Sequence, residues 1–256
     1  MKHQQILDKV HRRMGEAMED DIRRIVFTLM CSQKLSVESV LNKLMPRWDC
    51  ALDADKAEVT DNYKEMVILS LAVLLHKYGM ADKDITKKAL AAIDKLNDKV
   101  VLSDAFYHQT DKMKEFITSE PTPLSKKPWP PKNNITFYRA KDVVSIQLDK
   151  KYYAAYVHEN RHNEAPIIEF YDAVFDSRPT WEDIKDKRAK GNSNNHICKY
   201  GVTGMKDLPD YANQVHLIEA NVKEVPDSSH LTQSVGLWTI SDIIDVQRYI
   251  RGLFGS

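Results

Sequence analysis

The fold is decided by residues 134–172, which read NITFYRAKDVVSIQLDKKYYAAYVHENRHNEAPIIEFYD. Apolar and polar side chains alternate over residues 144–148, which is the period-two pattern of a half-buried strand. A tyrosine-rich, β-prone run follows at 152–157, and a third apolar run lies at 167–171. Only residues 149–151 separate the first two runs, and this spacing suits a tight hairpin. The stretch therefore predicts the antiparallel centre of a β-sheet.

The residues before this stretch indicate helices, because their apolar side chains recur at helical spacing. Glu19 to Asp21 are expected in the first turn of a helix, where carboxylates face the positive end of the helix dipole. Ser36 is expected to cap another helix, and Gly79 to end a helix over about 57–78 in the left-handed conformation. The pairs Arg12-Arg13 and Arg23-Arg24 lie beside acidic residues, which predicts a solvated face. No catalytic constellation is found in this half, and an all-α bundle is the simplest account.

Residues 119–133 contain five prolines and no regular period. Proline removes backbone donors and stiffens the chain, so this segment predicts a semi-rigid linker. The predicted organisation is a helical domain over residues 1–118, the linker over 119–133, and a second domain over 134–256.

The second domain is predicted to continue beyond the hairpins with short elements. Thr180 can cap a helix that extends to about Ala189, since an acidic residue follows three positions later. Residues 215–222 and 234–239 are expected to be strands, and an amphipathic helix closes the chain, with Thr239 or Ser241 as its cap. The predicted fold class is therefore α+β: a helical bundle, then a mostly antiparallel β domain with a C-terminal helix.

Composition excludes some classes of function. Lys+Arg and Asp+Glu both number 37 in 256 residues, so a generally basic nucleic-acid binder is not expected. The most apolar window, Met66–Leu75, is too short to cross a bilayer, and the amino terminus has no apolar signal core. Three widely spaced cysteines without a CxxC pair suit a reducing compartment. A cytoplasmic protein without a membrane partner is predicted.

The segment His158-Glu159-Asn160-Arg161-His162 matches the letters of a zinc-peptidase signature. In that signature two histidines four residues apart share a helix face, and the glutamate activates water. Here β-prone residues precede the segment, Arg161 places a cation beside the metal position, and Pro166 follows four residues after His162. A polar hairpin loop is therefore favoured, and a zinc-dependent hydrolase with His158 and His162 as ligands is the alternative.

Three segments of the second domain together resemble the immunity protein 26 family, which belongs to bacterial polymorphic toxin systems. They are KDVVSIQL at 141–148, KYYAAYV at 151–157 and PIIEFYD at 166–172. Members of that family open with Gly-Asp and an apolar strand, turn at Asp-Gly, and continue with an aromatic-rich strand. This chain departs from the pattern at Lys141, at Lys150 or Lys151, and at Ala155, where glycine is usual.

The resemblance implies a protein that binds a cognate toxin and neutralises it stoichiometrically, with no catalytic residue and no cofactor. Such a surface needs aromatic and arginine anchors within a polar rim. The expected partner-binding residues are Tyr152, Tyr156, His158, Glu159, Arg161, His162 and Trp181, and Trp238 is a further anchor. Strand alternation predicts that the tyrosines cannot all be buried, since Tyr153 points opposite to Tyr152 and Tyr156. A small β-barrel that stacks nucleic acid or peptide on exposed tyrosines is a further alternative.

Overall fold

The computed structural model describes residues 1–98, 100–124, 130–132, 135–233 and 236–255. The chain divides into two compact units. The first contains residues 1–45 and 51–131, and the second contains residues 46–50 and 132–256. The boundary near residue 131 lies within the predicted linker, and the five residues 46–50 come from inside a helix, which sequence periodicity does not reveal.

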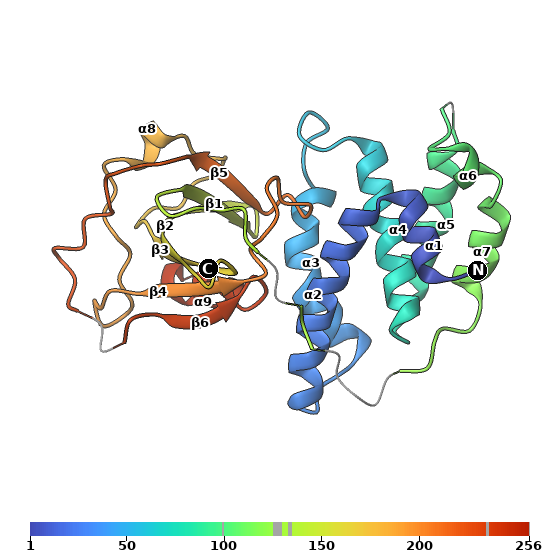
Figure 1. The fold of residues 1–256 in the computed structure, drawn as a ribbon, viewed down its shortest axis with the longest axis horizontal. Coiled ribbons are helices and arrows are strands. Elements are labelled where there is room, and N and C mark those ends of the chain that lie inside the picture. The colour runs from blue at the N-terminus through green and yellow to red at the C-terminus, as the bar shows by residue number, and fades with distance from the viewer. Residues whose placement is uncertain (99, 125–129, 133–134, 234–235, 256) are drawn as a thin grey trace. The chain divides into compact units, whose positions relative to one another are not determined.

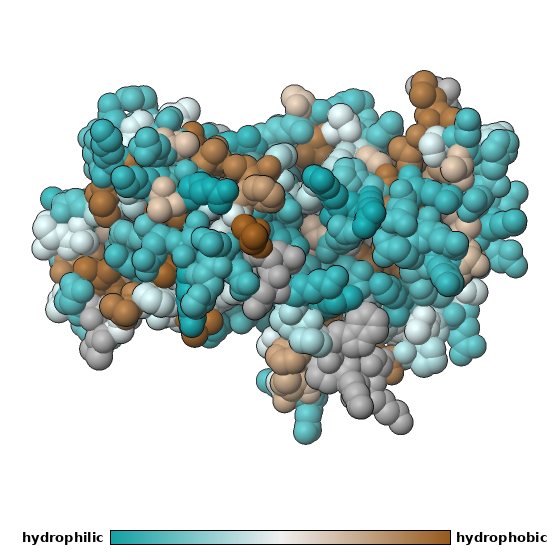
Figure 2. Space-filling model, viewed as in Figure 1, coloured by the Kyte–Doolittle hydropathy of each residue, from teal (hydrophilic) through white to brown (hydrophobic). Residues whose placement is uncertain are grey.

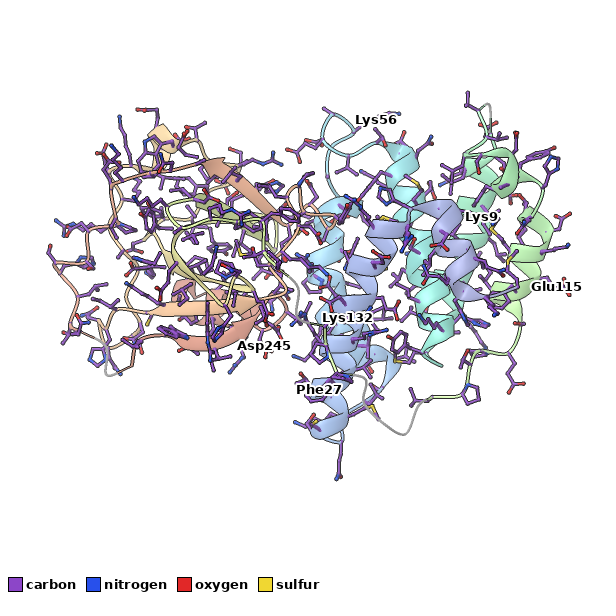
Figure 3. All side chains as sticks on the ribbon, in the orientation of Figure 1. Lys9, Phe27, Lys56, Glu115, Lys132 and Asp245 are labelled. Carbon is purple, nitrogen blue, oxygen red and sulfur yellow. The ribbon has the colours of Figure 1, made fainter. Side chains whose placement is uncertain are left out.

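The first unit is helical, as its periodicity predicts (Figure 1). Its helices are α1 (His3–Val10), α2 (Arg12–Cys31), α3 (Val37–Leu52), α4 (Asp61–Lys77), α5 (Lys83–Leu96), α6 (Asp104–Tyr107) and α7 (Thr110–Thr118). The backbone N–H of Ser39 donates to Ser36 Oγ at 3.0 Å, and Gly79 has φ +72° just after α4. These two helix ends are confirmed. Charged side chains such as Lys56 and Glu115 are exposed on this unit (Figure 3).

The predicted start of the second helix was wrong. Helix α2 begins at Arg12, so Glu19, Asp20 and Asp21 lie in its interior and are buried rather than in a first turn. The prediction of a solvated face for Arg23 and Arg24 was also wrong, because these acids are their partners. Arg24 lies 3.1 Å from Asp20 in a buried pair.

Glu19 is held by a wider network. Its Oε1 accepts from Lys77 at 2.8 Å, from Arg23 at 2.9 Å and from the Tyr78 hydroxyl at 3.1 Å. Burial opposes ionisation of this carboxyl, but Lys77 and Arg23 outweigh it and lower its pKa. A buried charge needs such pairing.

The second unit is built on one six-stranded sheet with the order β5-β1-β2-β3-β4-β6 (Figure 1). Its elements are β1 (Val143–Leu148), β2 (Lys151–Arg161), β3 (Ala165–Phe170), α8 (Trp181–Ile184), β4 (Lys199–Thr203), β5 (Val215–Glu219), β6 (Thr239–Asp242) and α9 (Val246–Phe254). Every neighbouring pair is antiparallel except β4 and β6, which are parallel. The α+β class, with a mostly antiparallel sheet and a C-terminal helix, is confirmed.

The two predicted hairpins are both present. Between β1 and β2, Asp149 and Lys150 have φ values of +51° and +61°. Positive φ at both central positions is characteristic of the type I′ turn, which suits the twist of a hairpin. Between β2 and β3, His162 and Asn163 have φ values of +52° and +61°.

Later elements are shorter than predicted. Helix α8 ends at Ile184 rather than near Ala189, and β5 ends at Glu219. Thr239 and Ser241 lie in strand β6 and not at a helix cap, and α9 follows Asp245. Of the expected strand 234–239, residues 234 and 235 lie outside the described residues. Proline-rich residues 125–129 lie outside them as well, while the backbone N–H of Thr122 donates to His76 O within the helical unit at 3.2 Å.

Both faces of the central strands are covered. Helix α9 packs on one face, where the rings of Tyr153 and Phe254 are 4.9 Å apart. On the other face, Tyr156, Tyr171, Ile184 and Val222 belong to one buried cluster. The prediction that the tyrosines cannot all be buried was therefore wrong, because the loops after β3 and β5 cover the face that α9 leaves open.

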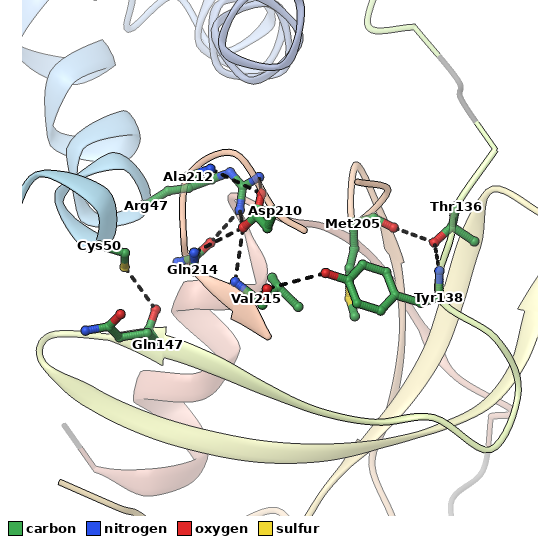
Figure 4. Close-up of polar contacts among 10 residues, drawn as sticks. All are labelled: Arg47, Cys50, Thr136, Tyr138, Gln147, Met205, Asp210, Ala212, Gln214 and Val215. Carbon is green, nitrogen blue, oxygen red and sulfur yellow. Dashed lines mark hydrogen bonds and ion pairs between the residues drawn. The ribbon is translucent and has the colours of Figure 1, made fainter. Parts of the chain in front are cut away.

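A buried ion pair lies within the second unit (Figure 4). Arg47 contacts both carboxylate oxygens of Asp210, at 2.7 and 3.0 Å, and also donates to Gln214 Oε1 at 3.0 Å. The backbone N–H groups of Gln214 and Val215 donate to Asp210 at 3.1 and 3.0 Å. Burial raises the pKa of the neighbouring Cys50 thiol to about 12, so this cysteine is a packed thiol rather than a nucleophile. The arrangement orders the loop before β5.

The face in Figure 2 is mostly hydrophilic, with apolar residues in small groups. Among the described residues, no helix is both long enough and apolar enough to cross a membrane.

Candidate functional site

The site begins with an irregularity in strand β2. Val157 pairs with Ile168 and Glu159 pairs with Ile167, so His158 is an extra residue in the ladder. Such a β-bulge bends the strand and redirects the side chains that follow it. His158 Nε2 lies 2.7 Å from Glu169 Oε2, and Glu169 is only 2% exposed. A buried carboxylate therefore holds the bulged residue.

The bulge decides which face the rest of β2 presents. Simple alternation from Tyr156 would place Glu159 and Arg161 on the opposite face. The extra residue reverses this, because a shift of one residue moves each following side chain to the other face. Arg161 therefore faces the same side of the sheet as Tyr156, which is opposite to the side that α9 covers.

A pocket of about 230 Å³ lies on this side of the sheet at the end of the second hairpin. Its lining residues are Arg161, His162, Glu164, Ala165, Gly201, Thr203, Trp238 and Ile240. The floor of the pocket follows from the strand register. Arg161 pairs with Ala165 across β2 and β3. Gly201 on β4 pairs with Ile167 on one side and with Ile240 on the other. Small side chains at Ala165 and Gly201 leave the depression.

Gly201 is needed for the pocket wall. A Cβ added there would lie 3.3 Å from Trp238 Cδ1, which is tighter than an ordinary contact. The absence of a side chain lets the indole of Trp238 approach strand β4. Ile240 is 69% exposed and Leu237 is 78% exposed. Trp238 and the exposed Ile240 thus both line the pocket, and Leu237 precedes Trp238 in the chain.

The pocket lining includes the polar side chains of Arg161, His162 and Glu164. Arg161 and His162 are exposed at the turn, and Glu164 is partly buried. The structure shows no ion pair for the Arg161 guanidinium with any described residue. An unpaired guanidinium beside an indole can bind a carboxylate in bidentate geometry.

The predicted partner-binding residues separate into two groups. Arg161 and His162 line the pocket. Glu159 is exposed on the same strand as Arg161, and His158 forms the bulge. Trp238, the further predicted anchor, also lines the pocket.

The other three predicted residues are not at this site. Tyr152 is 8% exposed and Tyr156 is 3% exposed, and the Tyr156 hydroxyl donates to Val222 O at 3.1 Å. Trp181 opens helix α8 and packs against the buried cluster of Tyr156. Burial contradicts the assignment of Tyr152 and Tyr156 as partner-binding residues, whereas Trp181 is partly buried and its assignment stays a prediction.

Sequence analysis missed Gly201 and Ile240. Gly201 is one of eight glycines that the chain scatters singly, and only its place beside Trp238 distinguishes it. For Ile240, the available signal was an isoleucine in the expected capping region of the last helix. Assigning that region to a strand would have pointed to a sheet edge.

The structure removes the basis of the zinc alternative. His158 lies at a strand bulge and His162 in a turn, so they do not share the helix face that the signature requires. No group of three or more His, Cys, Asp or Glu residues in the described parts of the chain has a geometry that could hold a metal ion. Burial of Tyr152, Tyr153 and Tyr156 likewise removes the stacking surface of the nucleic-acid alternative.

A second hollow, of about 460 Å³, lies near the end of α9. Its lysine is already engaged: Lys190 Nζ lies 2.7 Å from Asp172 and 5.2 Å from the centre of the Phe254 ring. The pocket at Arg161 is therefore the better candidate, since its guanidinium forms no ion pair within the described parts of the chain.

Comparison with known proteins identifies no relative: no family model, no curated protein and no solved structure matches the chain. The resemblance to the immunity protein 26 family stays a prediction.

Proposed function

We propose that this protein is an immunity protein, which binds a cognate bacterial toxin and neutralises it by stoichiometric protein–protein inhibition. The single observation that carries the location of binding is the pocket at the end of the second hairpin, whose lining includes both Arg161 and Trp238. Arginine and tryptophan are the residue types most often found as energetic anchors of interfaces.

The surroundings of the pocket support a protein partner. Ile240 is an exposed apolar side chain in its lining, and an apolar centre with a polar rim is the usual anatomy of an interface. The pocket is small beside the clefts that enclose whole small-molecule ligands. It suits one or two side chains of a partner rather than a separate substrate.

Inhibition by binding needs a rigid surface more than a reactive one. Arg161 follows the bulge that Glu169 holds through His158, and Trp238 lies against Gly201 on the sheet. Anchors positioned in this way lose little conformational entropy on binding, which raises affinity.

The proposal is tested with the toxin candidate encoded next to this gene. The toxin is expressed in bacteria with and without the full chain, and cell survival and co-purification are measured. We expect survival and a one-to-one complex with the full chain. Loss of viability despite soluble full chain, with no complex, would contradict the proposal.

The location is tested by Arg161→Ala and Trp238→Ala, with Arg188→Ala as the matched control. Arg188 is exposed, with 65% of its side chain accessible, and its partner is Asp227, away from the pocket. We expect each pocket variant to weaken the complex by about 2 kcal/mol, and the control to bind as the unaltered protein does. Equal binding by all three variants would move the site elsewhere.

A further inference from the structure

Strand β6 forms one edge of the sheet. It pairs with β4 on one side, and no described strand pairs with it on the other. An edge strand offers unpaired N–H and C=O groups to any extended segment that can reach them. Natural proteins often shorten such edges or place charged side chains on them. Strand β6 is short, but its first two residues, Thr239 and Ile240, are exposed and uncharged.

The direction of the backbone groups follows from two contacts. Ser241 O accepts from Thr203 Oγ1 at 3.2 Å, and the N–H of Ile243 donates to Thr203 O at 2.9 Å. Both groups therefore face β4. Since successive residues of a strand direct their backbone groups to opposite sides, Ile240 directs its N–H and C=O to the free edge.

Binding at this edge would continue into the pocket. Ile240 belongs to the edge and also lines the pocket, and Arg161 lies in the same lining. Glu164 contributes a carboxylate to the same lining, but the structure shows no ion pair between the Arg161 guanidinium and any described residue, so Arg161 is the group that offers positive charge to a bound partner. A carboxylate side chain complements it.

We propose that β6 accepts an extended segment of the toxin as an added strand, and that an acidic residue of the toxin surface beside that segment enters the pocket and pairs with Arg161, which lies on β2 beyond β4 and β3. This inference rests on the proposed function and specifies how the same site recognises its partner. Main-chain hydrogen bonds would supply affinity, and the pocket would supply selectivity for the acidic residue.

The first test compares Ile240→Pro with Ile240→Ala in the full chain, using the toxin that the survival assay identifies. Proline removes the outward N–H and is tolerated at strand edges, whereas alanine removes only the side chain. We expect proline to weaken the complex about tenfold more than alanine does, by loss of main-chain bonds. Equal binding by the two variants would overturn the added strand.

Hydrogen exchange keeps this test informative if the proline variant folds poorly. In the unaltered full chain, we expect the amide of Ile240 to become protected when the toxin binds. Unchanged exchange at Ile240 in a complex that forms and protects cells would overturn the added strand and leave the proposed function standing. Absence of any complex would overturn both.

The charge is tested by Arg161→Lys and Arg161→Glu. Lysine keeps the positive charge but loses the bidentate geometry, so we expect a moderate loss with lysine and abolished binding with glutamate. Equal binding by both variants would exclude an acidic partner residue. Pairing of β6 with a second copy of this chain would instead appear as a concentration-dependent dimer without toxin, which Ile240→Pro abolishes, and this result would also overturn the proposal.

Discussion

Strand β2 forms two hairpins that begin with similar turns and then differ. Both turns have two central residues with positive φ, Asp149 and Lys150 in one and His162 and Asn163 in the other. The first hairpin pairs without interruption from Leu148–Lys151 to Val143–Tyr156. The second contains the bulge at His158, and the pocket lies at its end. The regularly paired hairpin lies in the core of the sheet, and the candidate site lies at the end of the hairpin that has one extra residue.

Both hairpins contain buried polar groups without a hydrogen-bond partner among the described residues. In the first they include Ser145 Oγ and Gln147 Oε1, and in the second they include Glu169 Oε1, with the Tyr171 hydroxyl just after β3. Burial raises the pKa of Tyr171, and the nearby Tyr156 and Glu169 raise it further, so this phenol is neutral. Unsatisfied buried groups cost stability, so this cost does not distinguish the hairpins.

The largest difference in stability between the two hairpins is expected when Glu169, which holds the bulged residue, is replaced. We expect Glu169→Ala to lower the free energy of unfolding by about 2 kcal/mol, because the largely buried hydrogen bond to His158 is lost and the bulge loses its support. Lys151→Ala removes an exposed ion pair with Asp176 from the other hairpin, and we expect less than about 0.5 kcal/mol. Chemical denaturation measures both. Equal effects would show that the bulge needs no buried support.

The next effect is expected at the pocket floor. Gly201→Val should lower the free energy of unfolding by about 1 kcal/mol, because its side chain displaces the indole of Trp238. Gly201→Ala should have a smaller effect in the same direction. Thermal unfolding measures stability, and toxin binding measures the pocket. Full binding by the valine variant would show that Trp238 need not lie against β4.

The two turns themselves can be compared with glycine. Lys150 has φ +61°, an unfavourable conformation for a lysine, and we expect Lys150→Gly to stabilise the protein by about 0.5 kcal/mol. Asn163 has the same φ, but asparagine tolerates it, so Asn163→Gly should change stability by less. Denaturation midpoints decide between them. A larger gain at Asn163 would contradict the equivalence of the two turns.

The smallest effect on stability is expected at the tip of the bulged hairpin. Arg161→Ala removes an exposed side chain that has no ion pair with any described residue, so the free energy of unfolding should change by less than about 0.5 kcal/mol. Its effect on toxin binding should be large by comparison. A marked loss of stability would show that Arg161 serves the fold rather than a partner.

Local patterns predicted much of this fold. The hairpin spacing, the period-two run of β1 and the capping role of Ser36 depend on neighbours in sequence, and the structure bears them out. The ends of α8 and β6 were wrong because pairing with distant strands outweighs a local capping signal. Three of the eight residues that line the pocket, Arg161, His162 and Trp238, are among the residues predicted to bind a partner. Gly201 and Ile240 were missed, because their role depends on strands that are adjacent only in the folded sheet.

By itself, the sequence determined the order of the two units, the helical character of the first and the two hairpins of the second. These features follow from the spacing of apolar residues, which acts over a few positions. Only the tertiary structure decided that Tyr152 and Tyr156 are buried and that Arg161 faces the pocket. The first result requires loops that return over the sheet, and the second requires the bond between His158 and Glu169. The contact between His158 and Glu169 sets the direction of the side chains that follow the bulge. Alternation along the strand cannot predict this contact, because it considers only neighbours in sequence.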